Sequence, residues 1–354
     1  MKVKVGEITK IKTGKLDANA SSADGKYPFF TCSKDPLRIN SYSYDCECVL
    51  VAGNGDLNVK YYNGKFDAYQ RTYIIEDNSN GLLYMPYLYH FLEGYIGELR
   101  KQSIGGVIKY IKLGNLTDVL VELPSIEEQK YIVNLMNISL ELIELRKKTI
   151  DKLDSLVKAR FIEMFGDPVS NSKHLPLKTL PQLGTFGRGV SKYRPRNAPE
   201  LLNGPYPLIQ TGDIANSELY IKNYNNTYSE VGLKQSKMWD KGTLCITIAA
   251  NIAKTAILQF DACFPDSVVG FNGNNLTNNI FVHYWFSFFQ EILENQAPES
   301  AQKNINLKIL SELQIITPDI IEQNQFADFV HQVDKSRFDI KKSIIELERE
   351  VVYD

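Results

Sequence analysis

Several common features are absent from this sequence of 354 residues, and each absence excludes a class of protein. Its five cysteines contain no C-x-x-C pair, which excludes a disulfide scaffold, and Cys46 and Cys48 would share one face of a strand with poor zinc geometry. The N-terminus has no apolar segment of a signal peptide. The most apolar stretch, Leu244 to Phe260, is interrupted by Asn251 and Lys254, so no membrane span is expected. We expect a cytoplasmic protein with reduced thiols.

Motifs for catalysis are missing as well. The chain has no Walker-type GxxxxGK[ST], no GxGxxG after a strand, no GxSxG and no HExxH. It also lacks the Asn-Pro-Pro-aromatic run of an amino-methyltransferase and a compact, nuclease-like carboxylate cluster. The four histidines have no metal-ligand spacing, and His90 and His283 lie in aromatic-rich apolar segments that favour a core role. We therefore expect no catalytic residue, no metal site and no cofactor on this chain.

The net charge is small but unevenly distributed. Forty Lys and Arg against 42 Asp and Glu give −2, which argues against a nucleic-acid binder that relies on overall charge. Residues 319–354 carry 5 basic and 9 acidic groups, whereas residues 1–126 and 168–318 each carry a small positive excess. The acidity therefore belongs to the C-terminal segment, and the rest of the chain can hold locally basic surfaces.

The sequence repeats itself, which decides the architecture. Phe66-Asp67-Ala68 recurs as Phe260-Asp261-Ala262, and Pro124-Ser125-Ile126-Glu127-Glu128-Gln129 recurs as Pro318-Asp319-Ile320-Ile321-Glu322-Gln323, both at an offset of 194. The drift of this offset toward the start of each half indicates loop insertions between homologous domains. Earlier anchors match at 179 (Gly25, Tyr27 and Pro28 with Gly204, Tyr206 and Pro207) and at 175 (Val5, Ile8, Ile11 and Gly14 with Leu180, Leu183, Phe186 and Gly189).

A long helix is expected after each strand-rich region. The first begins at Ser125, a capping residue followed by Glu127 and Glu128, and is stopped by Gly166-Asp167-Pro168. Its roughly 39 residues would span roughly 58 Å. Apolar residues at steps of three and four predict its packing stripe, namely Leu135, Ile138, Leu142 and Leu145 and, after a break at Thr149, Leu153 and Leu156.

The second helix starts at Pro318-Asp319 and shows a coiled-coil seam with one polar position, Arg337. The seam comprises Phe326, Val330, Val333, Arg337, Ile340, Ile344, Leu347 and Val351. Such a helix needs a partner, and the central helix of the same chain is the natural one, although pairing with another chain stays open. Antiparallel pairing would relate the repeats by a pseudo-twofold axis. The predicted fold is α+β, with strand-rich domains at 1–124 and 167–317 and helices at 125–166 and 318–354.

Basic and polar side chains recur at corresponding positions in both halves of the sequence. The stretch from Pro168 to Pro199 contains six Lys and Arg and no acid, and the first 15 residues contain five lysines and one acid. Arg and Lys neutralise phosphates, and Asn, Gln, Ser and Arg read base edges. The candidate contacts to double-stranded DNA are Lys12, Lys15, Thr31, Ser33, Lys34, Asn54, Lys60, Gln70, Arg71, Gln102, Ser103, Lys109, Arg188, Ser191, Lys192, Tyr193, Arg194, Arg196, Thr211, Asn251, Lys254, Gln302 and Lys303.

Taken together, these motifs resemble the DNA-specificity subunits of type I restriction-modification systems over essentially the whole chain. The second half departs from the first in having Glu299-Ser300 where the first has Gly105-Gly106, and the C-terminal helix lacks its own Phe-Gly-Asp-Pro. The segments that carry the resemblance are residues 123–129, 317–323, 165–168, 25–28, 204–207 and 302–305.

The resemblance implies two target-recognition domains separated by helical spacers, and a bipartite, asymmetric DNA site with a fixed gap. It implies that the helices dock two methyltransferase (modification) subunits, to which restriction subunits are added. S-adenosylmethionine, ATP and magnesium would then belong to those partners, and this chain would be non-catalytic. Two alternatives stay open: a DNA-acting enzyme, nuclease or methyltransferase, with an unrecognised active site, and a protein scaffold without DNA reading.

Overall fold

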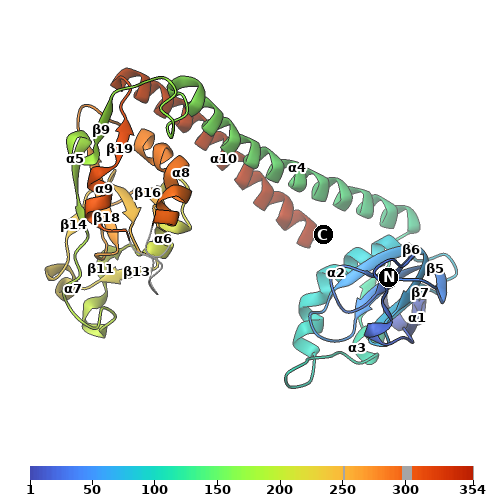
Figure 1. The fold of residues 1–354 in the computed structure, drawn as a ribbon. Coiled ribbons are helices and arrows are strands. Elements are labelled where there is room, and N and C mark those ends of the chain that lie inside the picture. The colour runs from blue at the N-terminus through green and yellow to red at the C-terminus, as the bar shows by residue number, and fades with distance from the viewer. Residues whose placement is uncertain (250–251, 297–304, 354) are drawn as a thin grey trace. The chain divides into compact units, whose positions relative to one another are not determined.

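The computed structural model describes residues 1–249, 252–296 and 305–353 (Figure 1). It has two compact units, one of Met1–Arg146 with Ser343–Asp354 and the other of Lys147–Lys342. We call them unit 1 and unit 2 and describe each by itself. None of the helices within the described ranges is long and apolar enough to cross a bilayer.

Unit 1 is built on a six-stranded sheet of order β2-β7-β5-β6-β3-β4, in which only the β3–β6 pair is parallel. A separate antiparallel pair, β1 with β8, joins the start of the unit to the residues before the long helix. The strands are β1 (Lys2–Lys4), β2 (Thr9–Thr13), β3 (Tyr27–Phe30), β4 (Leu37–Ile39), β5 (Tyr44–Ala52), β6 (Val59–Ala68), β7 (Thr72–Asp77) and β8 (Leu120–Glu122).

The central strand β5 is buried on both faces because its apolar run alternates between two clusters. Val49 and Val51 pack with the buried face of α2 (Met85–Gln102), whereas Cys48 and Leu50 pack with a second cluster around Phe66. The shorter helices are α1 (Val5–Ile8), α3 (Gly114–Thr117) and the 3-10 turn η1 (Ala18–Ala20). One helix and one sheet therefore form the core that carries the loops of unit 1.

Unit 2 has a five-stranded sheet of order β10-β18-β15-β16-β12, a four-stranded sheet β13-β11-β17-β14, and the antiparallel pair β9–β19. The strands are β9 (Leu177–Thr179), β10 (Gly184–Arg188), β11 (Leu202–Leu208), β12 (Tyr220–Ile221), β13 (Asn226–Tyr228), β14 (Met238–Trp239), β15 (Leu244–Thr247), β16 (Thr255–Leu258), β17 (Ala262–Cys263), β18 (Val268–Gly273) and β19 (Gln314–Ile316). The helices are α5 (Leu180–Leu183), α6 (Thr211–Ala215), α7 (Glu230–Lys234), α8 (Asn279–Gln296), α9 (Leu307–Glu312) and the turn η2 (Pro199–Leu201).

The two units repeat the same order of elements, which confirms the internal repeat. Strand β1, helix α1 and strand β2 correspond to β9, α5 and β10. Strands β2 and β10 each pair with the strand of their sheet that comes last in the sequence, β7 and β18 respectively. Helices α2 and α8 begin 194 residues apart and are each 18 residues long. Gly14 and Gly189 match in packing too, because an added Cβ would lie 2.1 and 2.2 Å from a backbone oxygen of Ala68 and Phe264. The fold is α+β, as predicted.

The repeated Pro-x-Ile-x-Glu-Gln motif is a structural clamp. Gln129 is fully buried, and its Nε2 donates to the carbonyls of Leu82 (2.8 Å) and Pro124 (3.0 Å) while its Oε1 accepts from the amide of Tyr84 (2.8 Å).

Gln323 makes the same contacts at the same offset, donating to Leu276 O (3.0 Å) and Pro318 O (2.9 Å). Its Oε1 accepts from Asn278 N and from Thr277 Oγ1, both at 3.0 Å. In each repeat, this glutamine therefore joins the start of a long helix to the loop that precedes α2 or α8.

The long helices are α4 (Ile126–Phe165) and α10 (Ile320–Tyr353). Ser125 and Glu128 form the predicted cap of α4, since the Ser125 amide donates to Glu128 (2.9 Å) and the Glu128 amide donates to Ser125 Oγ (3.3 Å). Gly166 ends the helix with φ +75°, a conformation that glycine adopts without strain. The two predicted ends of α4 are thus confirmed.

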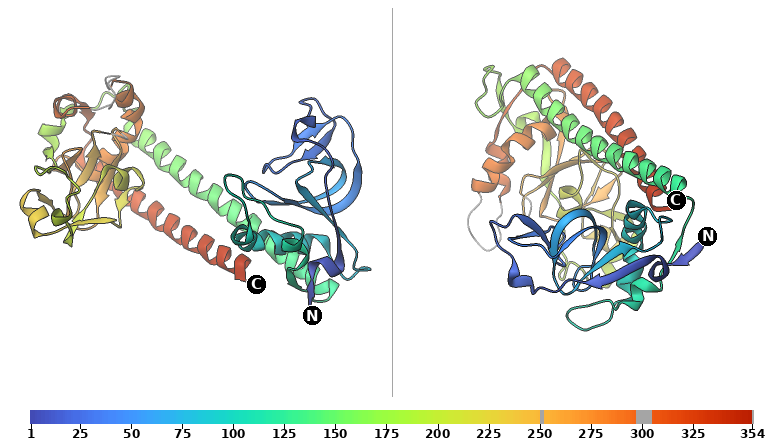
Figure 2. Two further views of the ribbon diagram at one scale, coloured as in Figure 1. Left: turned by 90° about the horizontal axis from the view of Figure 1, so that it is seen from below. Right: turned by 90° about the vertical axis from the view of Figure 1, so that its right-hand side faces the viewer.

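Within unit 2 these helices lie side by side and run antiparallel (Figure 2). The ring of Phe161 packs edge-on against Phe326 at 5.4 Å between centroids, and further along Arg337 donates to Asp154. Because the residue numbers rise on one helix as they fall on the other, the predicted antiparallel pairing is confirmed. The polar position Arg337 is 5% exposed and also lies 3.6 Å from Asp334.

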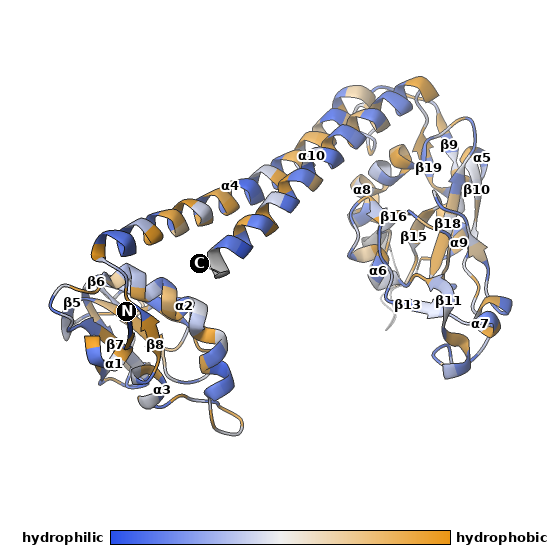
Figure 3. Cartoon of the chain, turned by 180° about the vertical axis from the view of Figure 1, so that it is seen from behind, coloured by the Kyte–Doolittle hydropathy of each residue, from blue (hydrophilic) through white to orange (hydrophobic). Residues whose placement is uncertain are grey.

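The packing stripe predicted for the central helix is wrong. Leu135, Ile138, Leu142, Leu145 and Leu156 are 38–50% exposed, and Leu153 is half-buried. The buried apolar residues of α4 instead include Val133, Ile143, Val157, Phe161 and Phe165. Both sets follow helical spacing, and the true contact stripe lies on a neighbouring face. Figure 3 shows hydrophobic residues along α4, including its first half.

Candidate nucleic-acid interface

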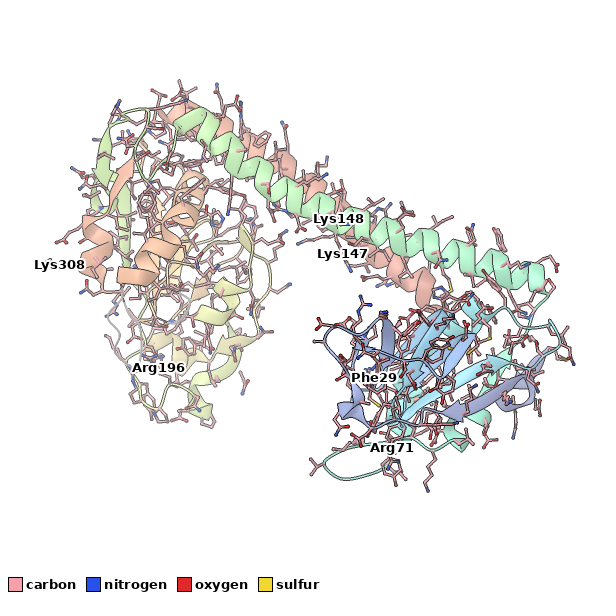
Figure 4. All side chains as sticks on the ribbon, turned by 45° about the vertical axis from the view of Figure 1, so that its right-hand side comes forward. Phe29, Arg71, Lys147, Lys148, Arg196 and Lys308 are labelled. Atoms are coloured by element: carbon pink, nitrogen blue, oxygen red, sulfur yellow. The ribbon has the colours of Figure 1, made fainter. Side chains whose placement is uncertain are left out.

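In unit 1, four segments that carry predicted DNA contacts are hydrogen-bonded to one another. The carbonyl of Arg71 accepts from the amide of Gly53 (2.8 Å) and from the thiol of Cys32 (3.6 Å). The Asn58 side chain donates to the Cys32 carbonyl at 2.9 Å. The amide of Gly55 donates to the Lys109 carbonyl at 2.9 Å. The loops around residues 31–34, 53–60, 70–71 and 103–110 therefore form one surface, on which Arg71 is labelled in Figure 4.

Most of the predicted side chains on these loops are accessible. Lys15 belongs to the same region, because the amide of Gln70 donates to the carbonyl of the next residue, Leu16, at 2.9 Å. Gln102 is exposed but its side chain accepts from Asn115 at 3.1 Å, and half-buried Ser103 donates to a helix carbonyl. Asn54 is half-buried, and the exposed members are Lys15, Ser33, Lys34, Gln70, Arg71, Gln102 and Lys109.

Three other predicted residues of unit 1 have internal contacts instead. Lys12 forms an ion pair with Glu76 and lies 4.9 Å from the centroid of the Tyr44 ring. Burial disfavours its charged form, but the hydrogen bond and charge of Glu76 outweigh this and raise its pKa. Thr31 is buried and accepts from the amide of Ser33. Burial lowers the pKa of Lys60, which donates to Asn58.

In unit 2 the predicted basic loop, residues 188–196, begins at the last residue of β10, and Gln235 is one of the side chains that hold it. Gln235 Oε1 accepts from the amides of Lys192 (2.7 Å) and Tyr193 (3.1 Å). Ser236 Oγ donates to the Val190 carbonyl at 2.8 Å. The loop backbone is thereby held by neutral side chains from outside the loop, and the loop's own Arg194 adds further bonds to it.

The two arginines of this loop share one carboxylate. Arg196 Nη2 lies 2.5 Å from Asp266 Oδ1, and Arg194 Nη2 lies 3.6 Å from Asp266 Oδ2. Arg194 also donates to the carbonyls of Ser191 (2.6 Å) and Tyr193 (2.8 Å). Sequence reasoning did not predict this role of Asp266, because the pair spans 70 residues. Arg196 is labelled in Figure 4.

The other loop residues divide into free and engaged groups. Arg188 and Lys192 are exposed, and neither has an ionic partner among the described residues. Tyr193 donates its hydroxyl to Glu200 at 3.0 Å. Ser191 is buried, and its Oγ has no hydrogen-bond partner in the described part of the chain.

The remaining predicted contacts of unit 2 lie away from the basic loop or outside the described residues. Thr211 is half-buried at the start of α6. Lys254 is half-buried in a hollow of about 340 Å³ that is also lined by His283 and Arg337. Asn251, Gln302 and Lys303 lie outside the described residues.

The sequence predicts no metal site among the His, Cys, Asp and Glu side chains of this chain. Within residues 1–249, 252–296 and 305–353, no three His, Cys, Asp or Glu side chains are grouped as metal ligands. His90 is buried against Asn137 (3.2 Å), and His283 contacts Thr255 Oγ1 (2.9 Å). Burial lowers the pKa of His283 to about 4, as expected for a neutral packed ring.

The model of the family described as "Type I restriction modification DNA specificity domain" matches residues 1–155 and 179–349. The chain belongs to this family. The predicted resemblance is therefore confirmed, and the protein is a DNA-recognition component of a type I restriction-modification system, from a family that is non-catalytic.

Relatives agree with this assignment. The type I restriction enzyme EcoDI specificity subunit of Escherichia coli is 29% identical over 368 residues, covering 94% of this chain and 80% of its own length. The EcoBI specificity subunit of the same species is 22% identical over 290 residues, covering 73% and 60%.

Solved structures share the fold of this specificity-family chain. The S subunit from M. genitalium has a TM-score of 0.61 at 15% identity and covers 99% of this chain and 93% of its own. A chain solved in work on complex assembly of the type I R-M system has a TM-score of 0.66 at 16% identity, covering 99% and 95%.

Proposed function

We propose that this chain determines which DNA sequence a type I complex recognises. That sequence would be bipartite and asymmetric, with one half read by residues 1–124 and the other by residues 167–317. The observation that supports this most is the repeat itself, because the same order of elements and the same glutamine clamp occur twice. Each copy also presents loops with exposed cations or base-reading side chains, such as Arg71 and Arg188. The two halves differ in these loops, so the sequences that they read should differ.

Residues 125–166 and 318–354 would act as spacers that set the gap between the half-sites. Helix α4 has 40 residues, which corresponds to about 60 Å of helix. Half-sites one turn of DNA apart are separated by about 34–36 Å. Linking two modest readers in one chain multiplies their affinities through effective concentration. A spacer made of paired helices also loses little conformational entropy on binding.

We further propose that the exposed stripe of α4 docks the modification subunit. Five apolar side chains follow one another at steps of four and three, namely Tyr131, Leu135, Ile138, Leu142 and Leu145, and they are 38–64% exposed. An apolar stripe of this length on a helix is typical of a protein interface. Two modification subunits, and restriction subunits added to them, would bring S-adenosylmethionine, ATP and magnesium for methylation, translocation and cleavage.

The test of DNA recognition is single-molecule mapping of methylated adenines in cells with and without this gene. We expect one bipartite motif to disappear when the gene is deleted, and its persistence would refute the proposal. In complemented cells, combined alanine substitution of Arg188, Lys192, Arg194 and Arg196 should reduce methylation of that motif. The control is Lys308→Ala, an exposed lysine on α9 that is labelled in Figure 4. Cleavage or methylation by the purified chain alone would favour the enzyme alternative.

The docking stripe is tested separately by purification of the complex. Leu135→Ser with Leu142→Ser should abolish co-purification of the modification subunit and leave the folded chain intact, because both side chains are already solvent-exposed. The control is Leu120→Ser on β8, where the side chain is 59% exposed. Unchanged co-purification of the double variant would contradict this docking surface.

A further inference from the structure

The loop between α2 and α3 carries apolar side chains that are exposed rather than packed into unit 1. Val107 is fully exposed, Ile108 is 63% exposed and Ile104 is 43% exposed. The loop projects from unit 1 in Figures 1 and 2. Single exposed apolar residues are ordinary, but two adjacent ones at the end of a projecting loop mark a contact surface.

The loop is held in one shape rather than being loose. Ile104 and Tyr110 exchange backbone hydrogen bonds of 3.0 and 2.9 Å, which close a narrow hairpin. Gly105 has φ +116°, and an added Cβ would lie 2.6 Å from the Ile108 carbonyl oxygen, so only glycine fits. The bond from Gly55 to the Lys109 carbonyl fixes the hairpin to the loop surface described above. Binding through this hairpin would therefore lose little conformational entropy.

The charge around the hairpin favours DNA as its occupant. Residues 100–112 include Arg100, Lys101, Lys109 and Lys112 and contain no acid. Lys109 is exposed and has no ionic partner among the residues that the structure describes. Arg100 and Lys101 are paired with Asp56 (2.8 Å) and Glu98 (2.6 Å), so the charge offered beside the apolar tip is that of Lys109. A cation next to an apolar tip matches a groove, in which phosphates flank the base edges. The apolar group on a base edge in the major groove is the C5-methyl of thymine, and this groove is about 12 Å wide.

We propose that Val107 and Ile108 are specificity-determining residues that contact thymine methyl groups in the major groove of the first half-site. This inference rests on the proposed function. It applies to the first repeat, because the corresponding residues 297–304 contain two separate alanines, Ala297 and Ala301, and no Val, Ile or Leu. The hairpin would read one thymine-bearing step, while Lys109 holds the neighbouring phosphate.

The experiment uses the complex assembled with its modification subunit and a duplex that carries the motif found by methylation mapping. Val107→Ser with Ile108→Ser should weaken binding of that duplex at least about fivefold and leave binding of a random duplex unchanged. The slope of log affinity against log salt concentration should not change, since an apolar contact releases no counterions. Lys109→Ala should weaken both duplexes and lower the slope by about 1. Leu120→Ser is the matched apolar control.

A second arm replaces each thymine of the first half-site by deoxyuridine. At one position the wild-type complex should lose affinity, and the serine variant should lose nothing further at that position. If no position shows this coupling, or if the serine variant binds the motif as well as wild type does, the proposal is overturned. Failure of the proposed function would instead appear as the absence of any methylated motif, before these measurements begin.

Discussion

Replacing Gln323 with leucine removes four hydrogen bonds from the interior of unit 2 while keeping a side chain of similar size. The amide is fully buried, and its partners are the carbonyls of Leu276 and Pro318, the amide of Asn278 and the hydroxyl of Thr277, at 2.9–3.0 Å. Each neutral hydrogen bond contributes about 1 kcal/mol net, so about 4 kcal/mol is at stake. The leucine methyl groups return about 1 kcal/mol through burial. We expect the free energy of unfolding of unit 2 to fall by about 3 kcal/mol.

Urea unfolding followed by tryptophan fluorescence measures this change directly, because both tryptophans of the chain, Trp239 and Trp285, belong to unit 2. The control is Gln325→Leu, a neighbouring glutamine on α10 whose side chain is exposed. In unit 1, Gln129→Leu should leave the fluorescence transition in place and destabilise the part of the far-ultraviolet signal that comes from unit 1. A loss of less than about 1 kcal/mol for Gln323→Leu, or one no larger than for Gln325→Leu, would refute the clamp.

Three further outcomes are expected. Asp266→Asn should free Arg194 and Arg196 and tighten binding to random DNA. Measured by fluorescence anisotropy, the slope of log affinity against log salt concentration should steepen by about 1, and an unchanged slope contradicts the pairing. A heptad inserted after Leu142 adds about 10 Å of helix and should change the gap in the methylated motif by about three base pairs, whereas an unchanged gap rejects the spacer. The pKa of His283 is lowered to about 4 in the folded state, so on acidification the unfolded state binds the proton first. The free energy of unfolding should therefore fall by up to about 3 kcal/mol as the pH drops from about 6.5 to 4. His283→Gln should flatten this pH dependence.

The helix ends and the repeat could be predicted because their signals are local. Ser125 with Glu128 forms a capping box within four residues, and Gly166 takes the left-handed conformation that a helix end needs. The glutamine of each motif was visible as an identity at a fixed offset, but its role was not. Only the structure shows that its amide is buried among backbone groups about 45 residues away.

The binding loops were harder to predict, because whether a charged side chain is available to DNA depends on residues that are distant in the sequence. Lys12 looked like one of five free lysines, yet Glu76 on the neighbouring strand β7 binds it. Arg196 looked like a free cation, yet Asp266, 70 residues further along, pairs with it. Lys109 and Arg188 have no such partner among the residues described. Composition and spacing can therefore place a basic loop, but only three-dimensional pairing separates its available cations from its internal ones.

The wrong packing stripe on α4 has a physical cause that bears on function. Leu142 and Ile143 are adjacent, so their side chains point about 100° apart around the helix, and each continues an apolar series at steps of three and four. A helix that pairs with one partner needs only one such series. In α4 the series of Ile143 and Val157 is buried, whereas the series of Leu135 and Leu142 remains in solvent. In the part of the chain that the structure describes, the second series stays exposed. This exposed series, rather than the coiled coil, is the feature that supports the proposed docking of another subunit on α4.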